Sequence, residues 1–186
     1  MEKLEVGCGT QKRPGYLGMD VVKLAGVDVV HDMNIAPWPF PDNTFTEAVF
    51  DDVLEHSKDL LTILSEVYRV CQNDAVIKVS VPHFTCDNMY TDPTHTTFFS
   101  SRSFDYFDKS VNHKHGFYLE GVDFKVRRVY LCFREYFLHN DEPPRFNPFR
   151  LIGLEYLINR YRRVYEKYFC WIMPITEVYF ELQVKK

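Results

Sequence analysis

Short apolar runs alternate with turns along the first eighty residues, and one longer amphipathic stretch lies among them. The apolar runs predict strands over residues 4–6, 16–19, 27–31, 47–51 and 75–81. Between 57 and about 70, apolar residues recur at helical spacing, which predicts a helix with one buried face. The run at 75–81 is almost continuously apolar, as expected for a central parallel strand. This alternation predicts a doubly wound, mostly parallel α/β sheet.

The rest of the chain is less regular. Residues 35–42 hold three prolines, and the aromatic residues between them can either face a bound base or cap the edge of the sheet. Residues 83–121 are polar and aromatic and predict an insertion over a pocket. Residues 122–133 alternate as a strand, and 149–168 predict one long helix with an apolar side and a basic side. Residues 175–184 alternate again and predict an antiparallel edge strand.

Composition and charge narrow the class of protein. The 186 residues are 46% hydrophobic, enough for one domain with a real core. A net charge of −4 gives no global signature of polyanion binding. The five cysteines lack C-x-x-C spacing, which favours neither a zinc site nor a disulfide framework. No signal peptide precedes the first strand and no apolar run reaches the ~18 residues of a membrane span, so a cytoplasmic protein is expected.

The first predicted strand ends in two glycines, Gly7 and Gly9, on either side of Cys8. Glycine has no Cβ, so the backbone can pass close to a ligand there. At the carboxyl edge of an open parallel sheet, such turns lie where nucleotide-like ligands bind. Asp20 ends the second strand, where a carboxylate can accept both hydroxyls of a ribose. The G-x-G-x-x-G fingerprint is absent, so a plain tight turn is the alternative interpretation.

These motifs, with those that follow them, resemble class I S-adenosylmethionine-dependent methyltransferases of the small type 11-like branch. The resembling segments are 6–10, 32–34, 38–45 and 53–56 together with Asp20, and more loosely 92–100. The resemblance is strongest over residues 4–82 and implies a Rossmann-like fold with S-adenosyl-L-methionine as cofactor. The chain departs from the family in two places. The helix after the glycine turn is missing or reduced to a turn, and residues 72–74 replace the usual Lys-Pro-Gly-Gly.

The resemblance also implies a cofactor site at the ends of the first four strands. Its residues are Gly7, Cys8, Gly9, Asp20, Val21, Asp32, Met33, Asp51 and Asp52. The glycines would face the methionine part of the cofactor, and the acid after the second strand would bind the ribose. The acid and the methionine after the third strand would bracket the adenine. One of the two adjacent acids after the fourth strand would lie near the methionine amine or the sulfonium.

Histidines of the insertion are the candidate catalytic groups. Methyl transfer is an in-line displacement that requires positioning and, for a hydroxyl acceptor, a base. Because histidine titrates near neutral pH, His95 is the first choice as base and His83 the second. For each of them, a hydrogen-bonded loop histidine is the alternative interpretation. His113 and His115 are expected in an exposed turn.

Asp52, Glu55 and His56 form a second candidate site, because positions i, i+3 and i+4 share one face at a helix start. Two carboxylates and an imidazole could bind a divalent metal, as similar runs do in some methyltransferases of ubiquinone biosynthesis and of small-RNA 3′ ends. The favoured interpretation is that no metal binds, with Glu55 stabilised by the helix dipole and His56 packing or hydrogen bonding. A further ligand, such as His83 or His95, does not follow from the sequence.

The sequence thus predicts one methyltransferase-like domain over residues 1–186. Residues 1–82 are its cofactor-binding half, 83–121 an acceptor lid, and 122–186 the C-terminal strands and basic helix. The predicted reaction is methyl transfer from S-adenosyl-L-methionine to a small-molecule or sugar hydroxyl or amine. Basic residues at 160–167 leave a nucleic-acid or protein acceptor open, although a solvated face or a homodimer contact is commoner for such a run. A non-catalytic scaffold or binding protein is the remaining alternative.

Overall fold

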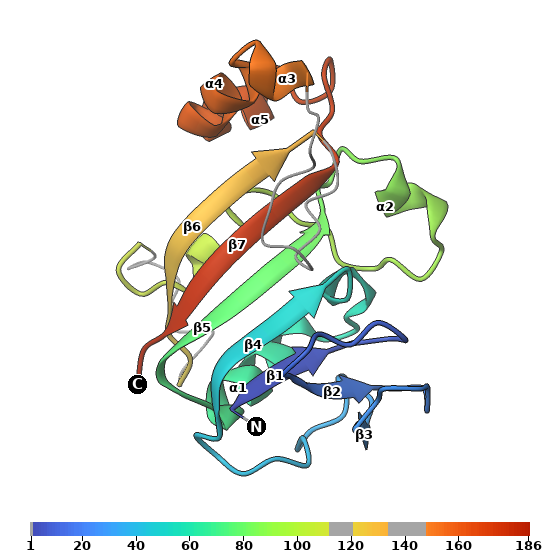
Figure 1. Cartoon of the computed structure of the whole chain (residues 1–186). Helices are drawn as coiled ribbons and strands as arrows, with labels where there is room; N and C mark the ends of the chain where they lie inside the picture. Colours follow the sequence, from blue (N-terminus) through green and yellow to red (C-terminus); the bar gives the residue numbers. More distant parts are fainter. Residues whose placement is uncertain (1, 112–120, 134–147) are drawn as a thin grey trace.

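The computed structural model describes residues 2–111, 121–133 and 148–186. Within them, one seven-stranded sheet has the order β3-β2-β1-β4-β5-β7-β6 (Figure 1). Its strands are β1 (Lys3–Val6), β2 (Leu17–Asp20), β3 (Val29–Val30), β4 (Phe45–Asp51), β5 (Cys71–Pro82), β6 (Phe124–Cys132) and β7 (Glu177–Val184). Strands β1 to β5 are parallel, and β7 lies antiparallel between β5 and β6. The predicted Rossmann-like, mostly parallel sheet with an antiparallel C-terminal strand is confirmed. The edge position predicted for residues 175–184 is wrong, because β6 pairs with the outer side of β7 and takes the edge.

Helices are distributed unevenly among the connections. They are α1 (Leu60–Val70), α2 (Asn88–Thr91), α3 (Pro148–Leu151), α4 (Leu154–Arg160) and α5 (Arg162–Tyr168), with 3-10 turns η1 (Leu54–His56) and η2 (Ser103–Phe107). The connections among β1, β2, β3 and β4 are described in full and contain no helix. The helix that the sequence lacks after the glycine turn is therefore also absent from the structure. No helix within the described ranges has the length and apolar character that crossing a membrane requires.

The prediction of a single long helix over 149–168 is wrong, because the segment forms three short helices. Gly153, with φ +73°, separates α3 from α4, and Tyr161 separates α4 from α5. A left-handed glycine ends a helix at little conformational cost. These helices lie beyond the ends of β6 and β7 (Figure 1). The predicted turn at His113 and His115 falls outside the described residues.

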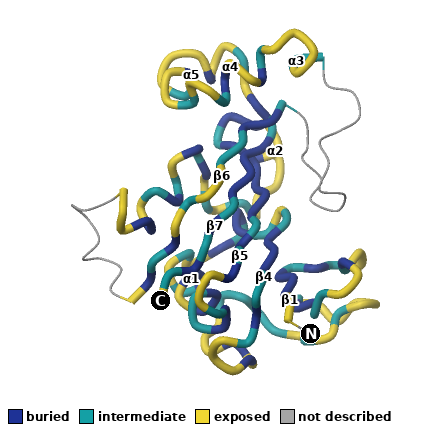
Figure 2. The backbone as a smooth tube through the Cα atoms, turned by 60° about the vertical axis from the view of Figure 1, so that its left-hand side comes forward, coloured by how far each residue is buried: buried dark blue, intermediate teal, exposed yellow. Residues whose placement is uncertain are grey.

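The main core lies between α1 and one face of the sheet. Asp59 caps α1 by accepting hydrogen bonds from the backbone N–H groups of Leu61 and Thr62. The helix then buries Leu64 and Val67 against the sheet. Figure 2 shows the central strands buried along most of their length, in contrast to the exposed turns of α3, α4 and α5. Burial on this scale stabilises the strand ends, where the cavities described below are found.

On the other face of the sheet lies the loop after β1, in place of the helix that the resembling family usually has there. The buried guanidinium of Arg13 donates from Nε to Oε1 of Glu5 (3.0 Å) and from Nη2 to Oδ2 of Asp51 (2.8 Å). Its backbone N–H also donates to Oε2 of Glu5 (2.7 Å). A buried charge is tolerated when it is paired and hydrogen bonded in this way. The loop is thus attached to β1 and β4 by polar contacts.

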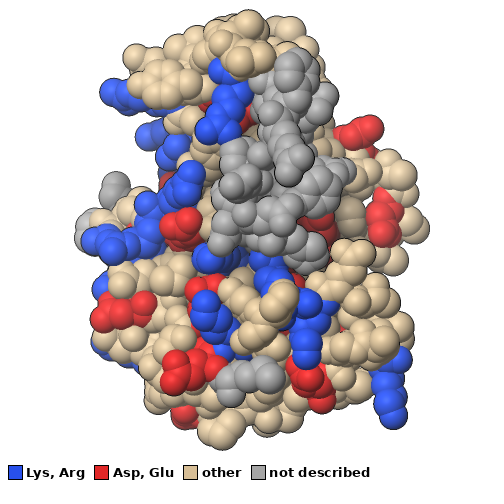
Figure 3. Space-filling model, in the orientation of Figure 1, with Lys and Arg blue, Asp and Glu red and all other residues tan. Residues whose placement is uncertain are grey.

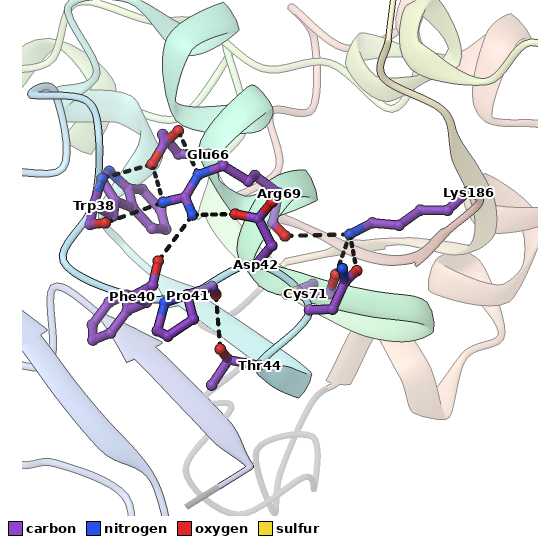
Figure 4. A network of polar contacts seen from close by, with 10 residues as sticks. Trp38, Phe40, Pro41, Asp42, Thr44, Glu66, Arg69, Cys71 and Lys186 are labelled. Atoms are coloured by element: carbon purple, nitrogen blue, oxygen red, sulfur yellow. Dashed lines mark hydrogen bonds and ion pairs between the residues drawn. The ribbon is translucent and has the colours of Figure 1, made fainter.

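The proline-containing segment 35–42 is attached to α1 by one arginine. The guanidinium of Arg69 donates to the carboxylate of Glu66 and to the carbonyl oxygens of Trp38 and Phe40 (Figure 4). Trp38 is 2% exposed and belongs to the core. Its indole Nε1 donates to the carbonyl oxygen of Met33 (3.0 Å). Of the two interpretations of this segment, the structure supports the one in which its aromatic residues cap the sheet.

Candidate active site

Two adjoining cavities open near the carboxyl ends of the parallel strands. The first, of about 310 Å³, lies at the ends of β1, β2 and β4 and is called the strand-end cavity. The second, of about 510 Å³, lies among η1, α2 and the loop that follows α2, and is called the loop cavity. Both volumes are typical of small-molecule sites. Asp52 and His56 line both cavities, so the two adjoin.

Gly7 shapes the strand-end cavity where β1 ends. Its φ of +70° is left-handed, and a Cβ at this position would lie 1.9 Å from Cγ2 of Val53. Any larger residue would therefore force Val53 to move. The N–H of Gly7 donates to the carbonyl oxygen of Met19 (2.8 Å), which holds the turn against β2. Gly7 thus presents bare backbone at this wall of the cavity.

Two carboxylates follow β2 and β3 on the same cavity. Oδ2 of Asp20 accepts from the N–H of Gly9 and Oδ1 from the N–H of Val22, both at 2.9 Å. Oδ1 of Asp32 accepts from the backbone N–H and the side-chain Nδ2 of Asn34, both at 2.9 Å. The backbone N–H of Asn34 holds the pKa of Asp32 below its usual range, against the effect of its burial. Carboxylate oxygens accept more than one hydrogen bond, so both acids can also bind a ligand.

The two adjacent acids at the end of β4 have different surroundings. Asp51 is paired with Arg13 and lines neither cavity. Asp52 lines both, and its φ of +50° is uncommon for a residue with a side chain. Its N–H donates to the carbonyl oxygen of Ser80 (3.0 Å), which fixes the turn against β5. Strain of this kind gathers at functional sites, and Asp52 is the acid at the junction of the cavities.

Six of the nine residues predicted for the cofactor line the strand-end cavity: Gly7, Asp20, Val21, Asp32, Met33 and Asp52. Cys8, Gly9 and Asp51 do not. Cys8 is buried beside Gly18, and burial raises the pKa of its thiol to about 11. Gly9 supports the cavity through its N–H bond to Asp20. Sequence reasoning missed His31 and Asn34, whose only signal was their position on either side of Asp32.

Comparison with known proteins agrees with this architecture. Residues 4–79 match the family model described as a methyltransferase domain. This match covers fewer than half of the 186 residues and supports a class I S-adenosylmethionine-dependent methyltransferase. The match to a methyltransferase domain supports S-adenosylmethionine as the cofactor. The search of curated proteins finds no match to the sequence.

Solved structures share the fold of this methyltransferase at low sequence identity. One is an S-adenosylmethionine-dependent methyltransferase from Archaeoglobus fulgidus, with TM-score 0.56 and 19% identity, covering 98% of this chain and 85% of that one. Another is the YcgJ protein of Bacillus subtilis, with TM-score 0.56 and 14% identity over 99% and 91% of the two chains. A third, from Thermotoga maritima, is described as a possible histamine N-methyltransferase; its TM-score is 0.56 and its identity 16%, over 100% and 82%.

In the loop cavity of the methyltransferase, Glu55, His56 and His95 converge. One potential ligand atom from each lies within 4.8 Å of the others. Glu55 and His56 belong to η1, whereas His95 comes from the loop after α2. The backbone N–H groups of Thr96 and Thr97 donate to the carbonyl oxygen of Glu55 (2.8 and 3.0 Å) and hold that loop against η1. Two segments some forty residues apart thus build one cluster.

Two atoms of this cluster are buried without a hydrogen-bond partner. They are Oε2 of Glu55 and Nδ1 of His95, and the described residues contain no other buried side-chain nitrogen or oxygen of this kind. Nε2 of His95 lies 4.0 Å from Oε1 of Glu55, which is too far for a hydrogen bond. Burial raises the pKa of Glu55 to about 8. An unpartnered buried polar atom costs about 1–3 kcal/mol, so this cluster is incomplete as it stands.

One ring nitrogen of His56 is hydrogen bonded, and the other can bind a ligand. Its Nδ1 lies 2.8 Å from Oγ1 of Thr94, and the Thr94 hydroxyl donates to Oδ1 of Asp92 (2.6 Å). Since the threonine hydrogen is directed to Asp92, Nδ1 of His56 is the donor to Thr94 and Nε2 keeps a lone pair. Burial and the neighbouring His95 lower the pKa of His56, which favours the neutral ring.

His83, the second predicted base, lies outside both cavities and is a structural residue. Its side chain is fully buried, with Nδ1 2.7 Å from Oγ1 of Thr85 and Nε2 3.2 Å from Oε1 of Glu166. Glu166 also accepts from the N–H (2.6 Å) and the hydroxyl (2.8 Å) of Ser101. With both ring nitrogens occupied, His83 cannot take a proton from a substrate, and it links the end of β5 to α5. The prediction that it acts as a base is therefore corrected.

Proposed function

We propose that this methyltransferase transfers a methyl group from S-adenosylmethionine in the strand-end cavity to a small acceptor in the loop cavity. One observation carries the proposal: Asp52 and His56 line both cavities. In-line displacement requires the donor carbon and the acceptor atom about 3–3.5 Å apart, which two adjoining cavities allow. The predicted lid, residues 83–121, would supply the acceptor side through the segment around Asp92 and His95.

The strand-end cavity supports the placement of the cofactor. In this proposal Asp32 and Met33 bind the adenine and Asp20 binds the ribose. The backbone at Gly7 faces the methionine part, and Asp52 lies near its amine or the sulfonium. Three carboxylates on one small cavity suit a cofactor that carries a positive sulfur. Gly9 and Asp51 would act only indirectly, by holding Asp20 and the loop after β1.

The loop cavity supports an acceptor without phosphate. Four acidic side chains line it, from Asp52, Glu55, Asp92 and Glu177, and within the described ranges no lysine or arginine does. A phosphate or a nucleic-acid backbone would be repelled there, whereas a neutral hydroxyl compound would not. Basic side chains gather instead along the edge where β6 lies (Figure 3). A small-molecule or sugar hydroxyl is the first candidate, and the carboxylate-rich wall favours a cationic amine as the second.

Calorimetric titration with S-adenosylmethionine and S-adenosylhomocysteine tests the cofactor site. The wild type should bind both, and Asp20→Ala should weaken binding at least tenfold because the ribose acceptor is lost. Asp42→Ala is the matched control, since this acid lies on the segment before β4 and lines neither cavity. A folded wild type that binds neither compound would contradict the proposal, as would an Asp20→Ala variant with unchanged affinity.

Transfer of a labelled methyl group then sorts the acceptors. A panel of sugars, amino alcohols and amines, each with a phosphorylated counterpart, should give labelled ethers or methylamines from the unphosphorylated members only. The position of the label can be read by NMR spectroscopy. Efficient labelling of RNA, DNA or the phosphorylated members would overturn the proposed acceptor class while leaving the cofactor site in place.

A further inference from the structure

We propose that Glu55, His56 and His95 form a binding site for a divalent first-row transition-metal ion on the wall of the loop cavity. The sequence favoured the absence of a metal, and it grouped Asp52 with Glu55 and His56. In the structure His95 joins Glu55 and His56, whereas Asp52 is not part of the cluster of converging ligand atoms. Residue spacing along one helix face could not reveal this set, because its third member comes from another segment.

The spacing of the three groups is close to that of a metal centre. Their ligand atoms lie within 4.8 Å of one another. Two atoms bound to one ion at about 2.1 Å are at most about 4.2 Å apart, and three evenly spaced ones are about 3.6 Å apart, so the widest separation would have to contract by about 0.6–1.2 Å. Side-chain rotations supply movements of this size. The hydrogen bonds from Thr96 and Thr97 to the backbone of Glu55 keep the two segments together during such a contraction.

The unpartnered atoms point independently to a ligand. The side chain of Glu55 is 1% exposed and that of His95 is 9% exposed. Each carries one buried atom without a partner, and no other buried side-chain nitrogen or oxygen in the described ranges is left in this state. Native proteins rarely leave such atoms unsatisfied unless a water, an ion or a ligand completes them. A cation would satisfy a carboxylate oxygen and an imidazole nitrogen together.

The surroundings of His56 match those of a metal ligand. The donor bond from its Nδ1 to Thr94, continued to Asp92, directs the lone pair to Nε2. Ligating histidines are commonly oriented by such a bond from the other ring nitrogen, often to a group linked to a carboxylate. The chain Asp92–Thr94–His56 therefore holds the ring in the form that can bind an ion.

The ligand types choose the class of ion. Magnesium and calcium bind oxygen ligands, whereas imidazole suits iron, nickel, copper and zinc, and mixed nitrogen and oxygen sites bind Mn²⁺ and, more tightly, Co²⁺. Two imidazoles and one carboxylate leave further coordination positions, and the cluster lines the loop cavity. If the proposed function holds, an acceptor hydroxyl bound there would release its proton to solvent more readily. Its oxygen would then form the bond to the methyl carbon as the carbon–sulfur pair returns to sulfur, and His95 would be a ligand instead of the base.

Binding of the metal alone tests the site without an acceptor. Full-length protein, stripped with a chelator, is titrated with Mn²⁺ by electron paramagnetic resonance and with Co²⁺ by visible absorption. One ion per chain is expected, with binding weakened at least tenfold in Glu55→Gln and in His95→Gln. Glu2→Gln is the matched control for Glu55→Gln, because this exposed glutamate lines neither cavity and lies outside the cluster. Mg²⁺ should compete poorly.

Titration of the same samples with S-adenosylhomocysteine separates the possible failures. Variants that bind it normally are folded, so their loss of metal is specific. If the wild type binds this compound but neither Mn²⁺ nor Co²⁺, the metal site is overturned and the proposed function survives. If the metal binds and S-adenosylhomocysteine does not, the proposed function fails and the metal site survives. Equal metal affinity in wild type and variants, or effective competition by Mg²⁺, would also overturn the site as proposed.

Discussion

Two buried histidine–glutamate pairs lie in this methyltransferase, and they differ in how completely they are satisfied. His83 and Glu166 are 3.2 Å apart and join the end of β5 to α5. His95 and Glu55 are 4.0 Å apart and join the loop after α2 to η1. All four side chains are nearly buried, with at most 11% exposed. Residue type and burial therefore do not distinguish the two pairs.

The hydrogen bonds of the two pairs distinguish them. Around the first pair, Thr85 and Ser101 complete the polar atoms. Burial alone would raise the pKa of Glu166, but the hydrogen bonds from His83 and Ser101 outweigh it and hold that pKa below its usual range. In the second pair two atoms lack partners, and burial raises the pKa of Glu55 to about 8.

The difference indicates a structural role for the first pair and a functional role for the second. A satisfied polar pair rigidifies a core, because removing either member leaves the other buried and alone. An unsatisfied pair on the wall of a cavity has capacity left for a ligand, and perturbed carboxyl groups of this kind gather at functional sites. Mutations test this difference: changes in the second pair should affect catalysis and changes in the first pair should affect stability, and the opposite result would contradict it.

The largest expected effect is on methyl transfer in Glu55→Gln and His95→Gln. Each should lower kcat about 10²–10⁴-fold with the acceptor identified in the labelling panel, because the group that prepares the acceptor is lost. The free energy of unfolding, measured by urea denaturation, should change by less than about 1 kcal/mol, since the two side chains form no hydrogen bond that the mutation would remove. A loss of several kcal/mol with near-normal kcat would reverse the assignment.

Next in size is the effect of His83→Asn on folding. The variant should lose about 2–4 kcal/mol of unfolding free energy in urea, because Glu166 keeps its charge but loses a buried partner. The affinity for S-adenosylhomocysteine should stay within about twofold of wild type, since His83 lines neither cavity. Unchanged stability together with loss of methyl transfer would restore His83 as a candidate base.

The two histidines show what the sequence can and cannot predict here. Both stand among polar and aromatic residues of the same predicted insertion, and both were candidates on chemical grounds. Their roles depend on Glu166 and Glu55, which lie 83 and 40 residues away along the chain. Contacts over such distances are set by how the segments pack, and no local pattern encodes them.

The strand ends behave differently, because local rules decide them. Gly7 follows β1 directly, Asp20 ends β2 and Asp32 lies two residues after β3. Parallel strands bring their carboxyl ends to one edge. The same pattern could not separate Asp51 from Asp52, since the backbone at Asp52 turns left-handed. It also overlooked Gly153, which divides the expected long helix. The mostly parallel sheet was thus predictable, whereas the order of β6 and β7 and the side on which single residues lie were not.

A smaller effect is expected from Thr94→Val, which removes the hydroxyl beside His56. The ring would lose the bond that holds its Nδ1 hydrogen, and metal affinity should fall about 10-fold, as is typical when the group orienting a ligand is removed. Mn²⁺ titration by paramagnetic resonance measures the change. Thr62→Val is a matched control, because its hydroxyl also donates to an aspartate, Asp59, but on α1. Equal affinity in Thr94→Val and wild type would exclude the orienting role.

The smallest effect is the pH dependence that Glu166 gives to folding. Its pKa in the folded state lies below the ordinary value of 4.5, so its carboxylate form stabilises the fold. That contribution is complete above the unfolded pKa and is lost as the pH falls through the folded one. The difference in unfolding free energy between wild type and Glu166→Gln should therefore be constant from about pH 6 to 7 and shrink below about pH 4.5. Urea denaturation at a series of pH values measures it, with Glu2→Gln, an exposed acid, as the control. A difference that instead grew toward acid pH would mean that Glu166 is protonated in the folded protein, and the contrast with Glu55 would disappear.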